Sequence, residues 1–188
     1  RETRAFLNPD IAAKMAEENH NEHNREWSFG GWMEDRITIR RGTYLEIKKL
    51  WLHTGIDLNA RAGTPVFCPV SGTIVYVGTD APLIGGWGYH VIQLVTFRGK
   101  KHALLYAHLT TAEVTEGSTL RRNDRIGTIG DKTQNGFWRP HLHLQLFAEI
   151  DHVTDWAKFS HDMDGYAKLS ERAEWSWICP DPTPLVFA

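Results

Sequence analysis

The stretch YHVIQLVTFRGKKHALLYAHL, residues 89–109, decides the fold class of this chain. It holds two runs rich in β-branched, aromatic and other apolar residues, which are typical of strands. The runs are separated by FRGKK at residues 97–101, a sequence typical of a hairpin connection. We therefore expect residues 89–97 and 103–109 to form strands of one antiparallel sheet.

Runs of the same character occur on both sides of this stretch, at residues 66–77 and 142–147. Glycine-containing turns separate them, and no helical crossover lies between them. This pattern predicts a mainly β fold, an antiparallel sheet that is sandwich-like or rolled. Residues 10–26 are good helix formers preceded by Pro9, so we expect a peripheral helix near the N-terminus.

We expect three parts along the chain: an N-terminal extension with a helix at residues 1–50, a core at residues 51–150, and a C-terminal tail at residues 151–188 packed on the core. In the tail, the alternation of Trp-Ser-Trp-Ile at residues 175–178 predicts an edge strand or another extended segment. The prolines of CPDPTP at residues 179–184 would end that segment.

Charge and composition exclude some classes of function. The chain has 188 residues, with 21 Lys and Arg against 23 Asp and Glu, giving a formal net charge of −2. This balance offers no basic stripe to neutralise phosphates, so we expect no nucleic-acid partner. No apolar run approaches the roughly 20 residues that span a bilayer. The first ten residues lack the apolar core of a signal peptide. Since the chain begins with Arg and not Met, this does not assign a compartment.

The cysteine content predicts no redox or structural metal framework. Cys68 and Cys179 are the two cysteines, and they lie far apart in the sequence. Without a Cys-x-x-Cys pair or a denser set, we interpret them as buried reduced thiols.

Three short segments carry the residues that suggest chemistry: HTGID at 53–57, YAHL at 106–109 and PHLHL at 140–144. Imidazole and carboxylate groups are typical zinc ligands, and a catalytic site leaves one coordination position open. Strand alternation places His141 and His143 on the same face, about 7 Å apart. One of them can hold a metal while the other lies over the metal's water. Each segment is on or beside an apolar β segment, where an imidazole is costly without a partner.

In the order and spacing of these segments, residues 52–147 resemble the lysostaphin-type (LytM-like) zinc metallopeptidases. HTGIDLNARAGTPVFCPVSGTIVYVG resembles the first motif of that family, and GWGYHVIQLV resembles the strand that follows. YAHL resembles the middle histidine motif, and VTEGSTLRRNDRIGTIGDKTQNG resembles the glycine-spaced stretch after it. PHLHLQLF resembles the closing histidine motif.

The resemblance implies a zinc-dependent endopeptidase with one Zn²⁺ per chain. His53, Asp57 and His143 would bind the zinc, and His108 and His141 would be the catalytic histidines. Zinc-activated water would attack a peptide carbonyl, with the two histidines sharing proton transfer and oxyanion stabilisation. The sequence leaves open which histidine is the base, and it leaves the oligomeric state open. The implied substrate is the peptide part of bacterial peptidoglycan, either stem peptides or cross-bridges.

The sequence departs from the family pattern next to the expected site. Arg139 replaces a commonly small residue, Gln145 replaces a frequent Glu, and Phe137 and Trp138 enlarge the same loop. The tail at residues 155–184 resembles a branch of the family that is fused to kinase-like and aminotransferase-like domains.

These departures leave two alternatives open. One is the same chemistry on a soluble peptide or amide within a cytoplasmic multidomain protein. The other is a non-catalytic binding or regulatory module, although all five family positions are present. An enzyme that acts on the cell wall would be periplasmic or extracellular, whereas the fused branch would be cytoplasmic.

Other motifs receive simple structural interpretations. Two histidines in HNEH at residues 20–23 lack the His-Glu-x-x-His order, so we interpret them as a solvated helix end. DMDG at residues 162–165 lacks the rest of a calcium loop and is interpreted as a surface turn. We expect the tryptophans mainly to pack the core, with Trp87 and Trp138 as the two that could instead line a groove.

Overall fold

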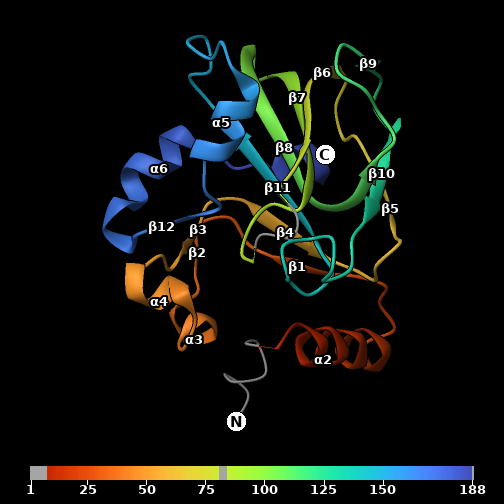
Figure 1. Cartoon of the computed structure of the whole chain (residues 1–188), viewed down its shortest axis with the longest axis vertical. Helices are drawn as coiled ribbons and strands as arrows, with labels where there is room; N and C mark the ends of the chain where they lie inside the picture. Colours follow the sequence, from red (N-terminus) through yellow and green to blue (C-terminus); the bar gives the residue numbers. More distant parts are fainter. Residues whose placement is uncertain (1–7, 81–83, 188) are drawn as a thin grey trace.

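The computed structural model describes residues 8–80 and 84–187, and its centre is an antiparallel sheet (Figure 1). Hydrogen-bonded neighbours follow the order β1-β4-β11-β8-β7-β6-β9. Their bounds are Ser28–Gly30 (β1), Ile56–Asn59 (β4), Leu142–Phe147 (β11), Lys100–Ala112 (β8), Tyr89–Phe97 (β7), Gly72–Thr79 (β6) and Thr119–Leu120 (β9). The predicted mainly β, antiparallel fold class is confirmed.

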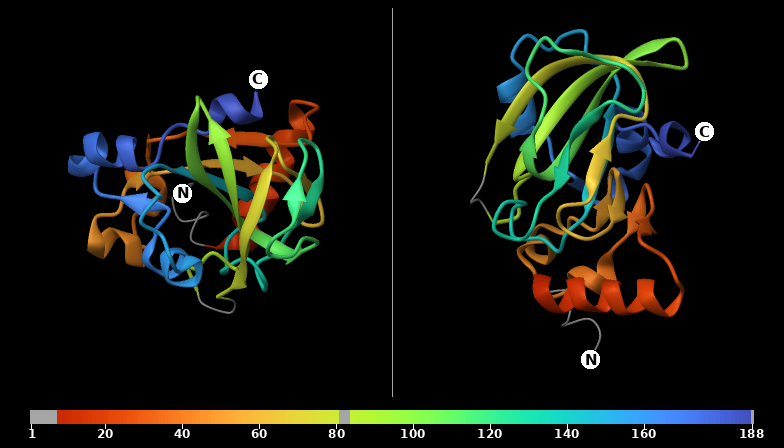
Figure 2. Two further views of the ribbon diagram at one scale, coloured as in Figure 1. Left: turned by 90° about the horizontal axis from the view of Figure 1, so that it is seen from above. Right: turned by 90° about the vertical axis from the view of Figure 1, so that its right-hand side faces the viewer.

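The sheet rolls over on one face. Strand β10 (Arg125–Ile129) pairs with both β8 and β5 (Pro65–Phe67). Strands β10 and β5 therefore fold back over the sheet (Figure 2). Apolar side chains fill the space between the layers and form the first core, which includes Val66, Ile74, Val91, Leu104, Tyr106, Ile126 and Leu144.

The other face of the sheet is covered by C-terminal helices α5 (Trp156–Asp162) and α6 (Arg172–Ile178), drawn in blue in Figure 1. A second core lies between them and the sheet and includes Leu52, Ile92, Leu105, Phe147 and Cys179. A small antiparallel sheet orders β12 (Tyr166–Ala167), β3 (Leu52–His53) and β2 (Glu34–Asp35). The N-terminal segment therefore contributes strands to both sheets.

The hairpin expected at the middle of the chain is confirmed. Phe97 of β7 is opposite Lys100 of β8, and Arg98 and Gly99 form the turn with φ of 50° and 75°. Positive φ at both central residues gives a turn whose twist matches that of the flanking strands. The prediction of one strand over residues 66–77 was wrong, because the segment around Pro69 interrupts it and leaves β5 and β6 as separate strands.

The prediction of an extended segment at residues 175–178 was also wrong. Residues 172–178 form helix α6, and the tail continues through α7 (Thr183–Val186). Trp175 and Ile178, three residues apart, both pack on the second core, whereas the side chain of Trp177 is 79% exposed. A spacing of three places residues on one helical face. The alternation of polar and apolar residues in this segment was therefore misleading. The division of the chain at residues 50 and 150 stays a prediction.

The N-terminal helix is confirmed as α2 (Pro9–Glu22), which is capped by the side chain of Asn8. Two short helices, α3 (Ile37–Arg40) and α4 (Tyr44–Lys48), were not expected. The interpretation of a solvated helix end was wrong for His20, which is only 7% exposed. The chain turns back after α2, and Arg25 N–H donates to the His20 carbonyl at 2.8 Å.

Both cysteines are buried and free, as expected. Among the described residues, no helix combines the length and apolarity that crossing a bilayer requires.

Candidate metal centre

Strand register brings the predicted metal ligands together. His143 on β11 is directly opposite Asp57 on β4 and opposite Ala107 on β8. Residues directly opposite in a sheet place their Cβ atoms about 4.5–5.5 Å apart on the same face. His53 ends β3, and only Thr54 and Gly55 separate it from β4, so its ring reaches the same point.

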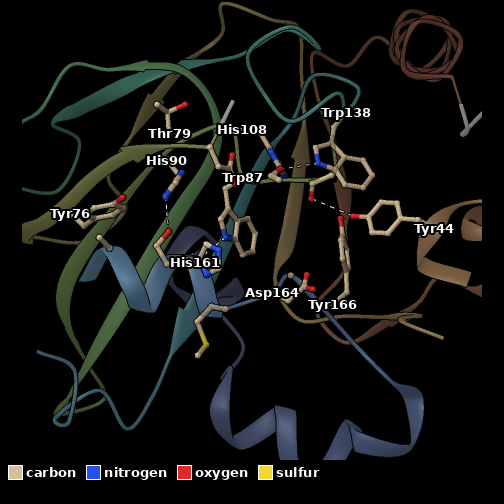
Figure 3. Close-up of a pocket in the computed structure, with 17 residues that line it drawn as sticks. Tyr44, Tyr76, Thr79, Trp87, His90, His108, Trp138, His161, Asp164 and Tyr166 are labelled. Carbon is tan, nitrogen blue, oxygen red and sulfur yellow. Dashed lines mark hydrogen bonds between the residues drawn. The ribbon is translucent and has the colours of Figure 1, made fainter. Parts of the chain in front are cut away.

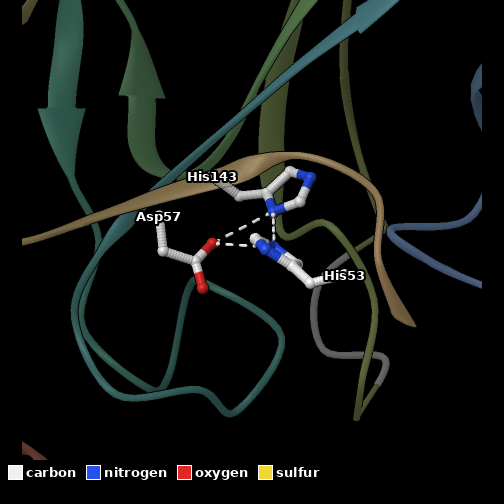
Figure 4. A group of neighbouring side chains, drawn as sticks. All are labelled: His53, Asp57 and His143. Carbon is white, nitrogen blue, oxygen red and sulfur yellow. Dashed lines mark hydrogen bonds and ion pairs between the residues drawn. The ribbon is translucent and has the colours of Figure 1, made fainter. Parts of the chain in front are cut away.

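Figure 4 shows the side chains of these three residues pointing toward one another. Asp57 Oδ1 lies 3.1 Å from His143 Nδ1 and 3.2 Å from His53 Nε2. The two ring nitrogens are 3.0 Å apart. All three residues are buried, and their ligand atoms lie within 4.8 Å of one another, so this group could hold a metal ion.

Hydrogen bonds on the outer side of each ring assign the tautomers. His53 Nδ1 is 3.2 Å from the Gly31 carbonyl oxygen, and His143 Nε2 is 2.8 Å from Gln145 Oε1. Both oxygens are acceptors, so these two nitrogens carry the ring protons. The lone pairs of His53 Nε2 and His143 Nδ1 therefore face Asp57 Oδ1, which is itself an acceptor. Three acceptors that converge without a donor fit a bound cation.

The charge states also fit metal binding. Burial, together with the nearby Arg36, lowers the pKa of His53 to about 3. Burial alone would raise the pKa of Asp57, but Arg36 and His53 hold it well below its usual range. At neutral pH the imidazole is neutral and the carboxylate is ionised, and these are the forms that coordinate metals.

Arg36 fixes the orientation of the Asp57 carboxylate, and the sequence analysis missed it. Its Nη1 donates to Asp57 Oδ2 at 2.6 Å, and its Nε donates to Glu34 Oε2 at 2.9 Å. A Cβ at Gly30 would lie 2.8 Å from Arg36 Nη2, so the lack of a side chain there makes room for the guanidinium. Because Arg36 takes Oδ2, Oδ1 is left facing the histidines. Residues 34–41 read EDRITIRR, and nothing in that mixed run distinguishes a buried arginine from its exposed neighbours.

His108 is aimed by an irregularity in β8. Tyr106 is opposite Val91 and Leu109 is opposite Tyr89, so two residues of β8 face one of β7. This is the arrangement of a β-bulge, which commonly redirects a side chain beside an active site. His108 adopts φ of 69°, in the left-handed region that non-glycine residues rarely enter.

His141 lies next to His108, with ring centroids 4.4 Å apart. Its Nδ1 donates to the Arg139 carbonyl oxygen at 2.7 Å, and its Nε2 lies 3.6 Å from Asp57 Oδ1. Burial lowers the pKa of His141 to about 4 and lowers the pKa of His108 well below its usual range. Both rings are therefore neutral at neutral pH. The Nε2 lone pair of His141 faces Asp57, one of the three residues that could hold a metal ion.

Two cavities lie against this cluster. The first, of about 380 Å³, is lined by His108, Trp87, Trp138 and Tyr166, among others (Figure 3). The second, of about 270 Å³, is lined by Asp57 and His141 and shares Trp138 and Tyr166 with the first. Trp87 and Trp138 thus line a groove, as the sequence analysis allowed, and Trp87 also packs against the second core. One histidine of the pair, His108, lines the first cavity, and the other, His141, lines the second.

The family model for peptidase family M23 matches residues 52–154, more than half of the chain. The chain belongs to peptidase family M23. The resemblance to the lysostaphin-type enzymes is thereby confirmed, and so is the enzyme class, a metallopeptidase. The fusion to kinase-like and aminotransferase-like domains stays a prediction.

Curated relatives match about half of the chain. An uncharacterised metalloprotease of Haemophilus influenzae is 33% identical over 95 residues, covering 50% of this chain and 18% of that protein. The DD-carboxypeptidase/endopeptidase Mpg of Neisseria meningitidis is 35% identical over 94 residues, covering 50% of this chain and 20% of that protein. The chain therefore spans about a fifth of the length of each of these relatives.

A solved structure shows the same fold over nearly the whole chain. The catalytic domain of the antimicrobial peptidase lysostaphin from Staphylococcus simulans aligns with a TM-score of 0.56 at 21% identity. The alignment covers 92% of this chain and 98% of that domain.

Proposed function

We propose that this M23 domain is a zinc-dependent endopeptidase that cleaves peptide bonds in bacterial peptidoglycan, in stem peptides or cross-bridges. The observation that carries the proposal is the convergence of His53, Asp57 and His143, with their lone pairs facing one another, beside a second pair of neutral buried histidines. The peptidoglycan substrate rests on the family resemblance of the sequence.

One Zn²⁺ would be held by His53 Nε2, Asp57 Oδ1 and His143 Nδ1, a nitrogen-rich set with room for a fourth position. When bound, zinc lowers the pKa of water and polarises a carbonyl group. Gln145 and the Gly31 carbonyl hold the two imidazoles in the tautomers that coordination requires.

His141 is the better placed general base. Its Nδ1 proton is engaged by the Arg139 carbonyl, so Nε2 is free to take a proton from the attacking water and to deliver it to the leaving amine. The Nδ1 atom of His108 is buried and has no hydrogen-bond partner among the described residues. In the tautomer that carries its proton on Nδ1, His108 would donate to the substrate oxygen as negative charge develops on it.

The activity is tested by incubating the zinc-loaded chain with purified peptidoglycan, defined muropeptides and small soluble peptide amides. Mass spectrometry then detects new free amines. We expect cleavage of peptidoglycan peptides by the parent and by His152→Ala, a histidine exposed at the surface, but not by His141→Ala. Cleavage of soluble peptides alone would contradict the peptidoglycan substrate. No cleavage of any substrate, with zinc confirmed at one per chain, would contradict the enzymatic role.

Zinc binding is expected to depend on Gly55. A Cβ at this position would lie 2.7 Å from both His143 Cε1 and the Leu144 carbonyl oxygen, closer than real contacts allow. Gly55→Ala should therefore displace His143 and weaken zinc binding by at least about tenfold, the lower end of what a disturbed ligand shell costs. Competition with a chromogenic chelator measures the affinity. The control is Gly31→Ala, where an added Cβ meets nothing within 4 Å and the backbone carbonyl that accepts from His53 is retained. Equal affinities for Gly55→Ala and the parent would contradict this packing argument.

A further inference from the structure

Three arginines border the second cavity: Arg36, Arg40 and Arg139. Arg36 and Arg40 come from the segment before the M23 match, and both are 5% exposed. Arg139 comes from the loop before β11 and is partly exposed. Asp57 and His141 line the same cavity, so the cationic groups lie beside the proposed metal centre.

The positive charges of these three guanidinium groups are not equally paired with carboxylates. Arg36 is paired with Asp57 and Glu34. Among the described residues, neither Arg40 nor Arg139 has a carboxylate partner within ion-pair distance. Arg139 instead donates from Nε and Nη2 to the amide oxygen of Asn59, at 3.1 and 2.5 Å.

Arg40 is the least satisfied of the three. Its guanidinium carbon lies 3.5 Å from the centre of the Tyr166 ring, which supports the cation from one face. Its Nε and Nη1 are buried and have no hydrogen-bond partner among the described residues. Burial, together with Arg36, lowers the pKa of Arg40. A buried cation with free donors is costly unless an anion completes the site.

The first cavity has the opposite character. Its acidic side chains are Asp80, which accepts hydrogen bonds from the backbone N–H groups of Trp87 and Gly88, and Asp164. The other polar side chains there are neutral or histidine. An anionic group of a bound peptide is therefore favoured on the arginine side of the histidine pair and disfavoured on the other side.

We propose that the second cavity is a carboxylate-binding subsite, in which Arg40 and Arg139 hold a carboxylate of the peptide substrate beside the metal centre. The proposal rests on the proposed peptidase function and adds a substrate preference to it. The planar fork of an arginine matches a carboxylate in a bidentate arrangement. Either a C-terminal carboxylate or an acidic side chain supplies this group.

The test measures binding, so that it does not depend on turnover. The protein is the zinc-loaded full chain carrying His108→Ala, a substitution on the first-cavity side. The probes are N-acetyl-tetra-alanine with a free C-terminal carboxylate, its carboxamide, and carboxamide forms with Glu or Gln in place of the third alanine. Calorimetric titration gives the dissociation constants. We expect at least one carboxylate probe to bind about tenfold or more tightly than its matched amide.

The arginine variants then locate the preference. Arg40→Met should remove it, Arg139→Met should weaken it, and Arg41→Met, at the exposed neighbouring position, should leave it unchanged. The C-terminal and side-chain probes show which carboxylate is recognised. If the His108→Ala protein binds neither carboxylate probe more tightly than its matched amide, the proposed subsite is overturned. This outcome does not depend on whether the arginine variants fold. A preference that survives both Arg40→Met and Arg139→Met would also overturn it. Failure of the peptidoglycan assay with an intact carboxylate preference would instead count against the proposed function alone.

Discussion

Replacing His141 with alanine is expected to lower the rate of peptide hydrolysis by about 10²–10⁴-fold, the range for a lost general base. The zinc content should stay at one per chain. The group whose ligand atoms converge is His53, Asp57 and His143. His141 lies beside this group, with its Nε2 3.6 Å from Asp57 Oδ1 and its Nδ1 bonded to the Arg139 carbonyl. Its loss removes a proton acceptor and leaves His53, Asp57 and His143 in place.

Single-turnover rates and zinc content by atomic absorption, measured on the same preparation, separate the two roles. His143→Ala should lose both zinc and activity, because it removes a ligand. His152→Ala should keep both, since that side chain is exposed at the surface and is not part of the histidine cluster. If His141→Ala loses its zinc, then His141 is a ligand, and the assignment of roles within the histidine cluster is wrong.

The strands and the site motifs could be predicted from sequence because local pattern determines them. β7 and β11 were predicted with their full bounds, since each is a continuous apolar run between turns. The alternation in His141-Leu142-His143 places both imidazoles on one face wherever the strand pairs. The structure brings all five predicted site residues together, although their roles as ligands and catalytic groups stay proposals.

Features that depend on distant pairing could not be predicted in the same way. Arg36 reaches Asp57 beside Gly30, which the pairing of β1 with β4 places opposite Asp57, and no local pattern encodes that pairing. Tyr166 meets Arg40 through the small sheet in which β12 pairs with β3. The helices of the tail are fixed by the apolar face that they cover, and the same residues in isolation suggest an extended segment.

The second large effect concerns stability, and it arises at Arg36. In the chain stripped of zinc, Arg36→Met leaves the buried Asp57 carboxylate without its strongest cationic partner. Removing one partner of a buried ion pair typically costs about 3–5 kcal/mol of unfolding free energy. Without Arg36, less positive charge offsets the effect of burial, so the pKa of Asp57 should rise. Taking up a proton would then relieve part of the cost of burying the charged carboxylate. We expect a loss of several kcal/mol in urea unfolding at neutral pH in the presence of a chelator.

Zinc should reduce this loss, because the metal supplies the positive charge that the variant lacks. Binding to the native state alone adds about 2.7 kcal/mol at a free ligand concentration of one hundred times the dissociation constant, and more where affinity is higher. The difference in unfolding free energy between the parent and Arg36→Met should therefore be larger without zinc than with zinc. By thermodynamic linkage, this is equivalent to tighter zinc binding by the variant. Arg41→Met, at an exposed arginine five positions along the same segment, should change neither value by more than about 0.5 kcal/mol. A loss that is the same with and without zinc would show that Arg36 stabilises the fold through packing, and not through the charge of the Asp57 carboxylate that faces the metal.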